Sequence, residues 1–194
     1  MLNTLLQIWG GTFYLLNKLF FSRAERGTTR QNQKKWRQYA WVSYLFGLPP
    51  WVFIFICERN WIAAAIESSG VPSMIMGLAI ARQGHEKFHG AAWLDHFAKL
   101  MILVGLGLSF YDFGFLATLN QVIELGIAIG FLMGTYLLAK SIPQGYFWIA
   151  LGNICAASLM FRQEYYILMA QQILSLGLVS DAYSIQQRKV RKKI

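Results

Sequence analysis

Polar side chains that could bind a small molecule are grouped in one long apolar segment of the chain, residues 115–139. Asn120 and Glu124 are four residues apart and therefore share one face of a helix, and Gln121 lies beside them. An ionisable group inside a membrane helix is costly unless it faces a partner or a wet cavity. These three residues are therefore candidates either for binding a hydrogen-bonding solute or for joining neighbouring helices.

Other apolar segments carry similar groups. Glu67 precedes two serines, Gln171 and Gln172 lie one turn from Ser175, and Asn153 sits among small residues. Amides pair with polar edges and indoles stack on rings, while no Lys or Arg is expected at mid-depth to bind a phosphate or a simple anion. The expected ligand is therefore uncharged or weakly cationic. Eight residues are predicted to line its site: Glu67, Asn120, Gln121, Glu124, Trp148, Asn153, Gln171 and Gln172.

Catalytic and metal-binding patterns are weak. His85 and His89 have the i,i+4 spacing that one helix face could use for zinc, but glycines flank them and no further ligand set is evident. Whether they or His96 bind anything is left open. Cys57 and Cys155 lack motif spacing and are expected to be small buried hydrophobic residues. Without a nucleophile–base pair or a phosphate-binding loop, we expect neither an enzyme nor a cofactor.

The composition is that of a membrane protein. Of the 194 residues, 56% are hydrophobic and 14% are charged, and the mean hydropathy is +0.39, which is too apolar for an ordinary soluble domain. A membrane-spanning helix needs roughly 20 apolar residues. Seven segments meet this need, which predicts an all-α membrane protein with helices at residues 3–21, 39–57, 60–80, 93–111, 115–139, 146–162 and 165–184.

The basic residues predict the orientation of these helices. Cytoplasmic loops are enriched in Lys and Arg. The first segment is followed by basic residues and not preceded by them, so it is expected to be a retained helix with its N-terminus outside. Seven crossings then place the C-terminus inside. The net charge of +9 is thus explained by topology and does not indicate nucleic-acid binding. Fourteen of the eighteen basic residues lie in alternating segments, at 23–37, 82–87, 140 and 188–193.

Several residues predict the local shape of the helices. Pro72 is expected to kink or open the third segment, and Pro49–Pro50 to break the second. Asp95 and Lys99 are spaced as an i,i+4 ion pair. Small residues let helix backbones approach closely. Such residues recur every four positions in the fifth segment, at Gly126, Gly130 and Gly134.

A weak internal repeat divides the chain. A shift of 107 residues aligns 41–78 with 148–185 and gives six identities, five of them in the last helix of each half. Segments one to three and five to seven run in the same direction, so they are expected to be parallel three-helix repeats joined by a linker helix. The predicted units are 1–80 with a basic cytoplasmic loop at 22–38, 81–114 with a cytoplasmic loop and the linker helix, 115–185, and a basic tail at 186–194.

This 3+1+3 arrangement, with the N-terminus outside and the C-terminus inside, resembles the SWEET-type architecture. Within it, the stretch GYFWIALGNICAASLMFRQEYYILMAQQILSLGLVSDAY resembles the PnuC-type nicotinamide riboside and vitamin transporters. The shared features are Trp148 opening a helix, Asn153 five residues later, aromatic residues at 165–166, and Gly177 in a last helix with a basic end. The likeness extends over roughly residues 115–185.

The resemblance implies a facilitator in the bacterial inner membrane. It would bind a vitamin-like nucleoside between the two three-helix units and move it by alternating access, and a cytoplasmic kinase would trap the solute by phosphorylation. Two alternatives stay open: a non-transporting membrane subunit or assembly factor whose polar residues join helices, and proton coupling through Glu124 or Glu67. Assembly into a homo-oligomer is also left open.

Overall fold

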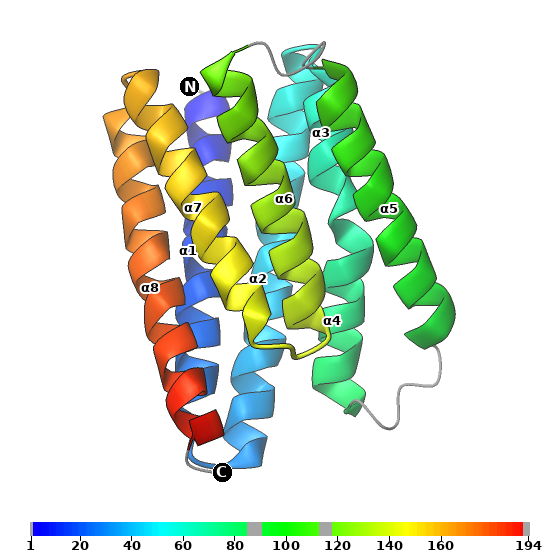
Figure 1. Ribbon diagram of the computed structural model, residues 1–194, viewed down its shortest axis with the longest axis vertical. Coiled ribbons are helices and arrows are strands. Elements are labelled where there is room, and N and C mark those ends of the chain that lie inside the picture. Colours follow the sequence, from blue (N-terminus) through cyan, green and yellow to red (C-terminus); the bar gives the residue numbers. More distant parts are fainter. Residues whose placement is uncertain (1, 85–90, 113–117, 192–194) are drawn as a thin grey trace.

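The computed structural model describes residues 2–84, 91–112 and 118–191, and within these ranges it contains helices and no strand (Figure 1). The prediction of an all-α protein is confirmed. The helices are α1 (Leu2–Arg26), α2 (Arg30–Cys57), α3 (Trp61–Ser69), α4 (Val71–Gln83), α5 (Ala91–Asp112), α6 (Leu119–Ala139), α7 (Gln144–Arg162) and α8 (Tyr166–Arg191).

Helices α3 and α4 are one predicted segment, interrupted at Gly70. Pro72 lies in the first turn of α4, where its missing N–H needs no helical partner, but further inside a helix it would displace the carbonyl four residues earlier. The Ser69 hydroxyl donates to the carbonyl of Ile66 at 2.6 Å beside the break. The prediction that Pro72 opens this segment is confirmed, and α3 and α4 together count as one of seven long helices.

Helix α2 contradicts the other proline prediction. It runs from Arg30 to Cys57 without interruption, with Pro49 and Pro50 inside it. Prolines remove backbone donors, but packing against neighbouring helices can hold such a helix together. Here α2 packs closely along α1, and the ring of Tyr14 fills the space where a Cβ on Gly47 would stand, 2.5 Å from its Cδ1 atom.

The predicted basic loop at 22–38 is also mostly helical. Helix α1 continues to Arg26 and α2 begins at Arg30, so residues 27–29 alone connect them. Arg, Lys and Gln are good helix formers, so helices continue beyond their apolar parts. The Thr29 side chain accepts a hydrogen bond from the backbone N–H of Asn32 at 3.3 Å and caps α2.

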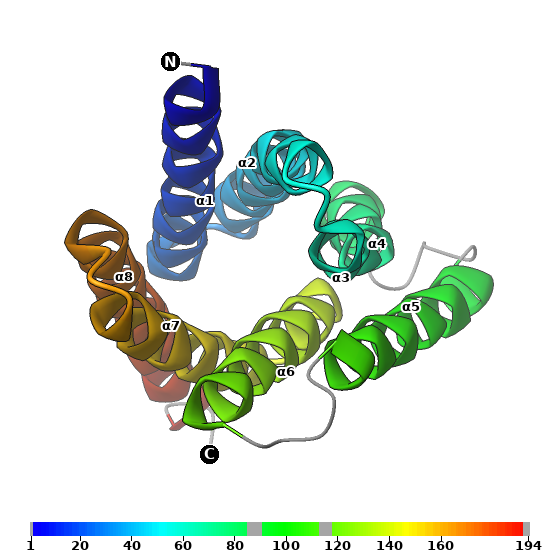
Figure 2. The ribbon, with the colours of Figure 1, turned by 90° about the horizontal axis from the view of Figure 1, so that it is seen from above.

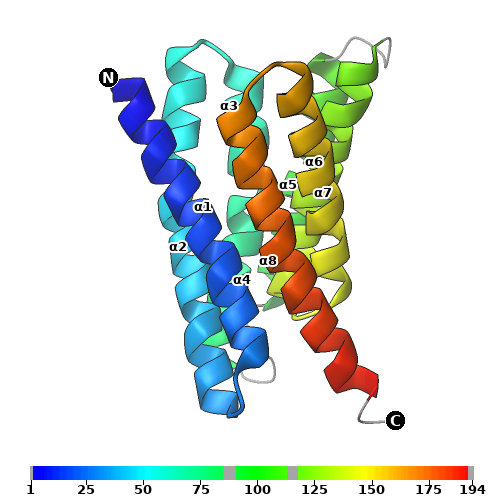
Figure 3. The same ribbon diagram turned by 90° about the vertical axis from the view of Figure 1, so that its left-hand side faces the viewer.

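Six of the seven long helices form a ring, with α5 outside it (Figure 2). Around the ring, α1 contacts α2, α2 contacts α3 and α4, α4 contacts α6, and α6, α7 and α8 follow until α8 meets α1. Helix α5 packs against α3, α4 and α6. We call α1–α4 the N-terminal half and α6–α8 the C-terminal half. Helices α1 and α8, which join the halves on one side, lie side by side and run in the same direction (Figure 3).

One end of the bundle holds most of the basic residues described. The α1–α2 and α6–α7 connections and the last turns of α8 lie there (Figure 1). We call this the basic end and the other the opposite end. The basic residues at the basic end are Arg23, Arg26, Arg30, Lys34, Lys35, Arg37, Arg82, Lys99, Lys140, Arg188, Lys189 and Arg191.

Among the described residues, four segments are long and apolar enough to cross a membrane: Arg30–Cys57, Ala63–Gln83, Ala92–Tyr111 and Leu119–Ala139. Large apolar side chains on the outer surface, such as Leu103 and Ile167, fit a lipid environment. These features indicate a membrane protein. Helices α1, α7 and α8 are of comparable length but are not among these four segments, and they lie next to one another in the ring. Their membrane crossing remains a prediction.

Helices α6 and α7 pack at very short distance through glycines. A Cβ on Gly130 would stand 2.6 Å from the Cα of Gly152, and one on Gly134 would stand 2.9 Å from the backbone nitrogen of Ile149. A Cβ on Gly126 would lie 2.7 Å from the sulfur of Cys155. The predicted close approach along the glycine stripe is confirmed, and the stripe is used within the C-terminal half.

This packing predicts a large effect of one methyl group. Gly130→Ala is expected to destabilise the protein by about 1–3 kcal/mol, because the backbone of α7 would have to move. Thermal unfolding of the purified protein in detergent measures the change. Gly107→Ala on α5 is the matched control, since no atom lies within 4 Å of its added Cβ. Equal melting temperatures for the two variants would contradict the predicted role of Gly130.

Candidate functional site

Five polar side chains from four helices meet between the two halves, and we call them the central polar cluster: Tyr14, Lys18, Tyr44, Glu67 and Thr135. The Tyr14 hydroxyl donates a hydrogen bond to the Glu67 carboxylate. The Lys18 ammonium lies 4.9 Å from the centre of the Tyr44 ring. The hydroxyls of Tyr44 and Thr135 are 3.3 Å apart, and this hydrogen bond connects α2 of the N-terminal half with α6 of the C-terminal half.

Local packing fixes these side chains. Tyr14 and Lys18 are one turn apart on α1 and so point to the same side. The rings of Tyr14 and Tyr44 meet edge to face at 5.1 Å, and Trp41 stacks on Tyr44 at 6.4 Å. Glu67 lies in the last turn of α3, just before the break at Gly70. The helix break and the aromatic contacts thus bring acid, base and hydroxyl groups together.

Because they are shielded from water, the charges of Lys18 and Glu67 stabilise each other. Lys18 is only 7% exposed and Glu67 is half-buried, and the two are close enough for their charges to influence each other without a direct salt bridge. Burying an isolated charge is costly, and an opposite charge or an aromatic ring face lowers that cost. The cluster also presents three hydroxyls that can each donate and accept. Such a set can exchange its internal hydrogen bonds for bonds to a polar solute placed between the halves.

The predicted residues on α6 lie near its beginning. The Nε atom of Arg162 donates to the side-chain oxygen of Asn120 at 2.8 Å, at the opposite end of the bundle. Gln121 forms a capping box with Thr118, in which each side chain accepts from the backbone N–H of the other residue. Glu124, one turn further, is half-buried. Asn120 and Gln121 therefore stabilise the helix start and its contact with α7, because α6 begins at Leu119.

The predicted residues on α7 and α8 are also spread out. Asn153 is 1% exposed, and its amide donates to the carbonyl of Ile149 in its own helix at 2.8 Å. Trp148 is half-buried and its ring meets Phe147 at 5.8 Å. The Gln171 amide donates to the carbonyl of Gly11 at 3.3 Å, across the contact of α8 with α1. Gln172 is half-buried on α8. Of the eight predicted residues, Glu67 belongs to the central polar cluster.

Sequence reasoning missed Tyr14, Lys18, Tyr44 and Thr135 as parts of one site. Lys18 was not predicted to lie near a site, yet it is buried two turns from the C-terminal end of α1. A signal was present: Lys18 interrupts an apolar run, with Tyr14 one turn before it. The predicted segment 3–21 contains Lys18, but the sequence analysis assigned it no role.

A second polar group lies at the basic end, and we call it the Glu25 cluster. The carboxylate of Glu25 forms a salt bridge with Arg37 at 2.7 Å and accepts from the Tyr146 hydroxyl at 2.9 Å. The Lys189 ammonium donates to the backbone carbonyl of Glu25, and Arg37 donates to the Ser141 hydroxyl at 2.9 Å. Glu25 is 3% exposed. The cluster joins α1 and α2 to α7, α8 and the α6–α7 connection.

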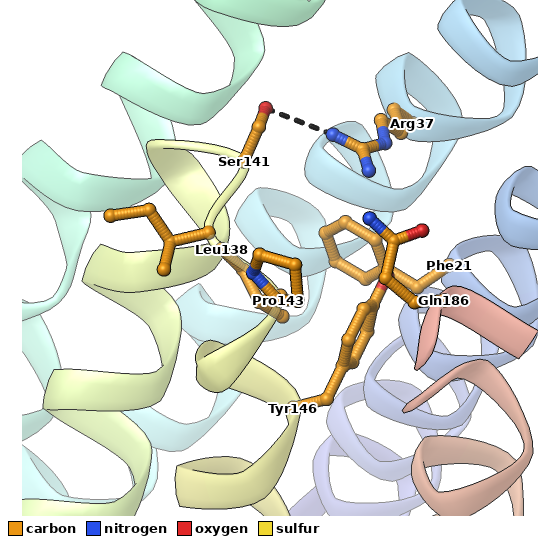
Figure 4. Close-up of a pocket in the computed structure, with 8 residues that line it drawn as sticks. Phe21, Arg37, Leu138, Ser141, Pro143, Tyr146 and Gln186 are labelled. Atoms are coloured by element: carbon orange, nitrogen blue, oxygen red, sulfur yellow. Dashed lines mark hydrogen bonds between the residues drawn. The ribbon is translucent and has the colours of Figure 1, made fainter. Parts of the chain in front are cut away.

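The Glu25 cluster borders a small pocket between the halves (Figure 4). Arg37 reaches over it toward Ser141, and Tyr146 points toward Phe21 and Gln186. The empty space there, about 200 Å³, includes open solvent, and none of it has room for a water molecule. The side chains of the two halves are therefore closely packed at this point.

Two further ion-pair groups lie at the basic end. Asp181 on α8 accepts from Ser22 at 2.5 Å and pairs with Arg26 at 2.7 Å. Asp95 on α5 pairs with Lys99 at 2.8 Å, which confirms the predicted i,i+4 pair, and with Lys140 at 2.9 Å. The hydrogen bond to Asp95 raises the pKa of Lys140 above its usual value.

The parts of the chain that the structure describes contain no group of three or more His, Cys, Asp or Glu residues able to hold a metal ion. His96 is exposed on α5, and His85 and His89 lie outside the described residues. Both cysteines are free; Cys155 packs beside Gly126 and Cys57, contrary to expectation, is exposed. Comparison with protein-family models, with curated proteins and with solved structures gave no match.

Proposed function

We propose that the chain is a membrane facilitator for a small uncharged or weakly cationic, vitamin-like solute, nicotinamide riboside or a related compound. The class of solute comes from the sequence resemblance. The observation that carries the proposal is the central polar cluster, in which Lys18 is buried and Glu67 is half-buried beside the contact of α2 with α6. Ionisable groups in such a position face a partner or a polar path, since lipid cannot solvate them.

The charges of the cluster limit the class of solute that it can bind. Lys18 supplies a buried positive charge that could attract an anion, but the nearby Glu67 carboxylate offsets that charge. A pair that is neutral overall suits an uncharged solute that forms hydrogen bonds, or a cation that Glu67 holds while Lys18 turns toward the face of Tyr44. The Tyr14 and Tyr44 rings supply apolar faces for an aromatic base.

Alternating access would occur by rocking of the two halves about the cluster. The contacts of α4 with α6 and of α8 with α1 each join the third helix of one half to the first helix of the other. This equivalence supports a pair of parallel repeats with α5 as linker. The concentration of basic residues at one end supports an N-terminus outside and a C-terminus inside the bacterial inner membrane. A cytoplasmic kinase would then trap the solute.

A binding panel tests the proposal. Purified protein is titrated calorimetrically with nicotinamide riboside, uncharged nucleosides, a carboxylate analogue and a phosphorylated analogue. We expect binding of the riboside or an uncharged relative and at least tenfold weaker binding of the phosphorylated compound, because no second buried cation has been found in the cluster residues described to offset two negative charges. Absence of both binding and vesicle uptake across the panel would overturn the proposal. Uptake with and without a proton gradient tests coupling through Glu67 or Glu124.

The alternative is a non-transporting subunit whose polar residues join helices. The Arg162–Asn120 and Gln171–Gly11 bonds favour it, since both connect helices of this chain. The glycine stripe, however, is already covered by α7, so it does not supply a surface for a partner. A stoichiometric partner that co-purifies with a protein lacking solute affinity would favour this alternative.

A further inference from the structure

We infer that the Glu25 cluster is a latch that holds the basic end of the bundle closed and controls access to the central polar cluster from that side. The inference rests on the proposed function. It concerns Glu25 and Arg37 of the N-terminal half and the groups of the C-terminal half that they hold: Ser141, Tyr146 and Lys189.

The position of the latch follows from the helix periodicity. Phe21 lies one turn beyond Lys18 on α1, and Leu138 lies one turn beyond Thr135 on α6. Both line the closed pocket next to Arg37 (Figure 4). A solute leaving the central polar cluster toward the basic end would therefore meet this pocket first, where even water finds no room.

One bond of the latch lies within the N-terminal half, and three others cross between the halves. The Glu25–Arg37 salt bridge lies within the N-terminal half and fixes the two side chains. Three bonds then cross to the C-terminal half: from Tyr146 to the Glu25 carboxylate, from Arg37 to Ser141, and from Lys189 to the Glu25 carbonyl. Any separation of the halves at this end must break all three. The Glu25–Arg37 salt bridge holds both side chains in position, and the three crossing bonds can break while this salt bridge stays intact.

The three crossing bonds of the latch are stronger than the neutral hydrogen bonds that join the halves elsewhere. Hydrogen bonds with a charged partner are stronger than neutral ones. The three crossing bonds of the latch each involve Glu25, Arg37 or Lys189. The central Tyr44–Thr135 bond and the Gln171–Gly11 bond, closer to the opposite end, are neutral and measure 3.3 Å each. The charged bonds, together with the Asp181–Arg26 pair, thus favour closure at the basic end.

Cysteine accessibility tests the latch without any solute. In a Cys57→Ser, Cys155→Ala background, Leu138→Cys reports access to the closed pocket. Inside-out and right-side-out vesicles are treated with a membrane-impermeant maleimide. We expect Tyr146→Phe with Ser141→Ala, which removes two crossing bonds and keeps the salt bridge, to raise labelling from the basic side about tenfold. Unchanged labelling in this double variant would overturn the latch.

Asp95→Asn is the matched control. It breaks one ion pair within α5 and one between α5 and the end of α6, and neither crosses between the halves, so labelling should stay at the parent rate. An equal rise in both variants would mean general loosening and would also contradict the latch.

A covalent link across the same contact tests closure directly, in variant protein whose thermal unfolding in detergent shows that it is folded. Arg37→Cys with Ser141→Cys is joined by a short bis-methanethiosulfonate linker across the same contact. Labelling of Leu138→Cys should then be blocked, and reduction should raise it above the parent rate. An equal labelling rate of Leu138→Cys with and without the linker would overturn the latch. Since neither assay needs a solute, failure of the latch and failure of the binding panel are separate outcomes.

Discussion

Replacing Lys18 with Met is expected to weaken binding of the transported solute at least tenfold and to destabilise the protein by about 3 kcal/mol. Methionine keeps the length of the side chain but leaves Glu67 without its opposite charge. Because α1 is packed closely against α2, the surroundings cannot relax to bring in another cation. Calorimetric titration measures the binding, and thermal unfolding in detergent measures the stability.

The double variant Lys18→Met, Glu67→Gln separates the two effects. Removing both charges should restore most of the stability, because no unpaired charge stays buried, while solute binding should stay weak. Lys99→Met is the matched control, since Lys99 is exposed on α5 and pairs with Asp95 there. Full recovery of binding in the double variant would show that the charges only support the fold.

The helices could largely be predicted from the sequence, because apolar length and glycine spacing act locally. Residues 60–80 show this best: their apolar pattern predicted the helix and Pro72 its break at Gly70. Pro49 and Pro50 show the limit, since α2 stays intact through packing that no local pattern reveals. Likewise, the basic run around Arg30 predicted a loop, although its residues have high helix propensity and Thr29 caps the next helix.

The site was harder to predict because hydrogen-bond partners depend on the ends and tilts of helices. Asn120 and Gln121 fit a binding face by spacing, yet α6 starts at Leu119, so Gln121 caps the helix and Asn120 bonds Arg162 of α7. Asn153 was predicted to line the solute site, but it is 1% exposed and its amide bonds a carbonyl of its own helix. Glu67 was predicted and Tyr14 was not, since the bond between them joins residues far apart in sequence. Pairing of this kind requires the arrangement of the ring.

Replacing Arg37 with Met is expected to destabilise the protein by about 3–5 kcal/mol, the usual effect of removing one partner of a buried ion pair. Glu25 is 3% exposed and would keep the Tyr146 hydroxyl as a donor but lose its opposite charge. Arg26→Met is the matched control, because Arg26 directly follows Glu25 in α1 and also lies at the basic end. The Arg26 side chain is 63% exposed in its pair with Asp181, so its loss should cost at most about 1 kcal/mol.

Salt distinguishes the two pairs further, because exposed charges are screened and buried ones much less so. Raising the ionic strength from about 0.01 M to 1 M shortens the Debye length from about 30 Å to about 3 Å. It should therefore reduce the difference between Arg26→Met and the parent while leaving the effect of Arg37→Met nearly unchanged. Thermal unfolding at both salt concentrations measures this. If both variants lost the same stability at low salt, or if salt erased the effect of Arg37→Met, the Glu25–Arg37 pair would be an ordinary surface contact, and the closed basic end would need another explanation.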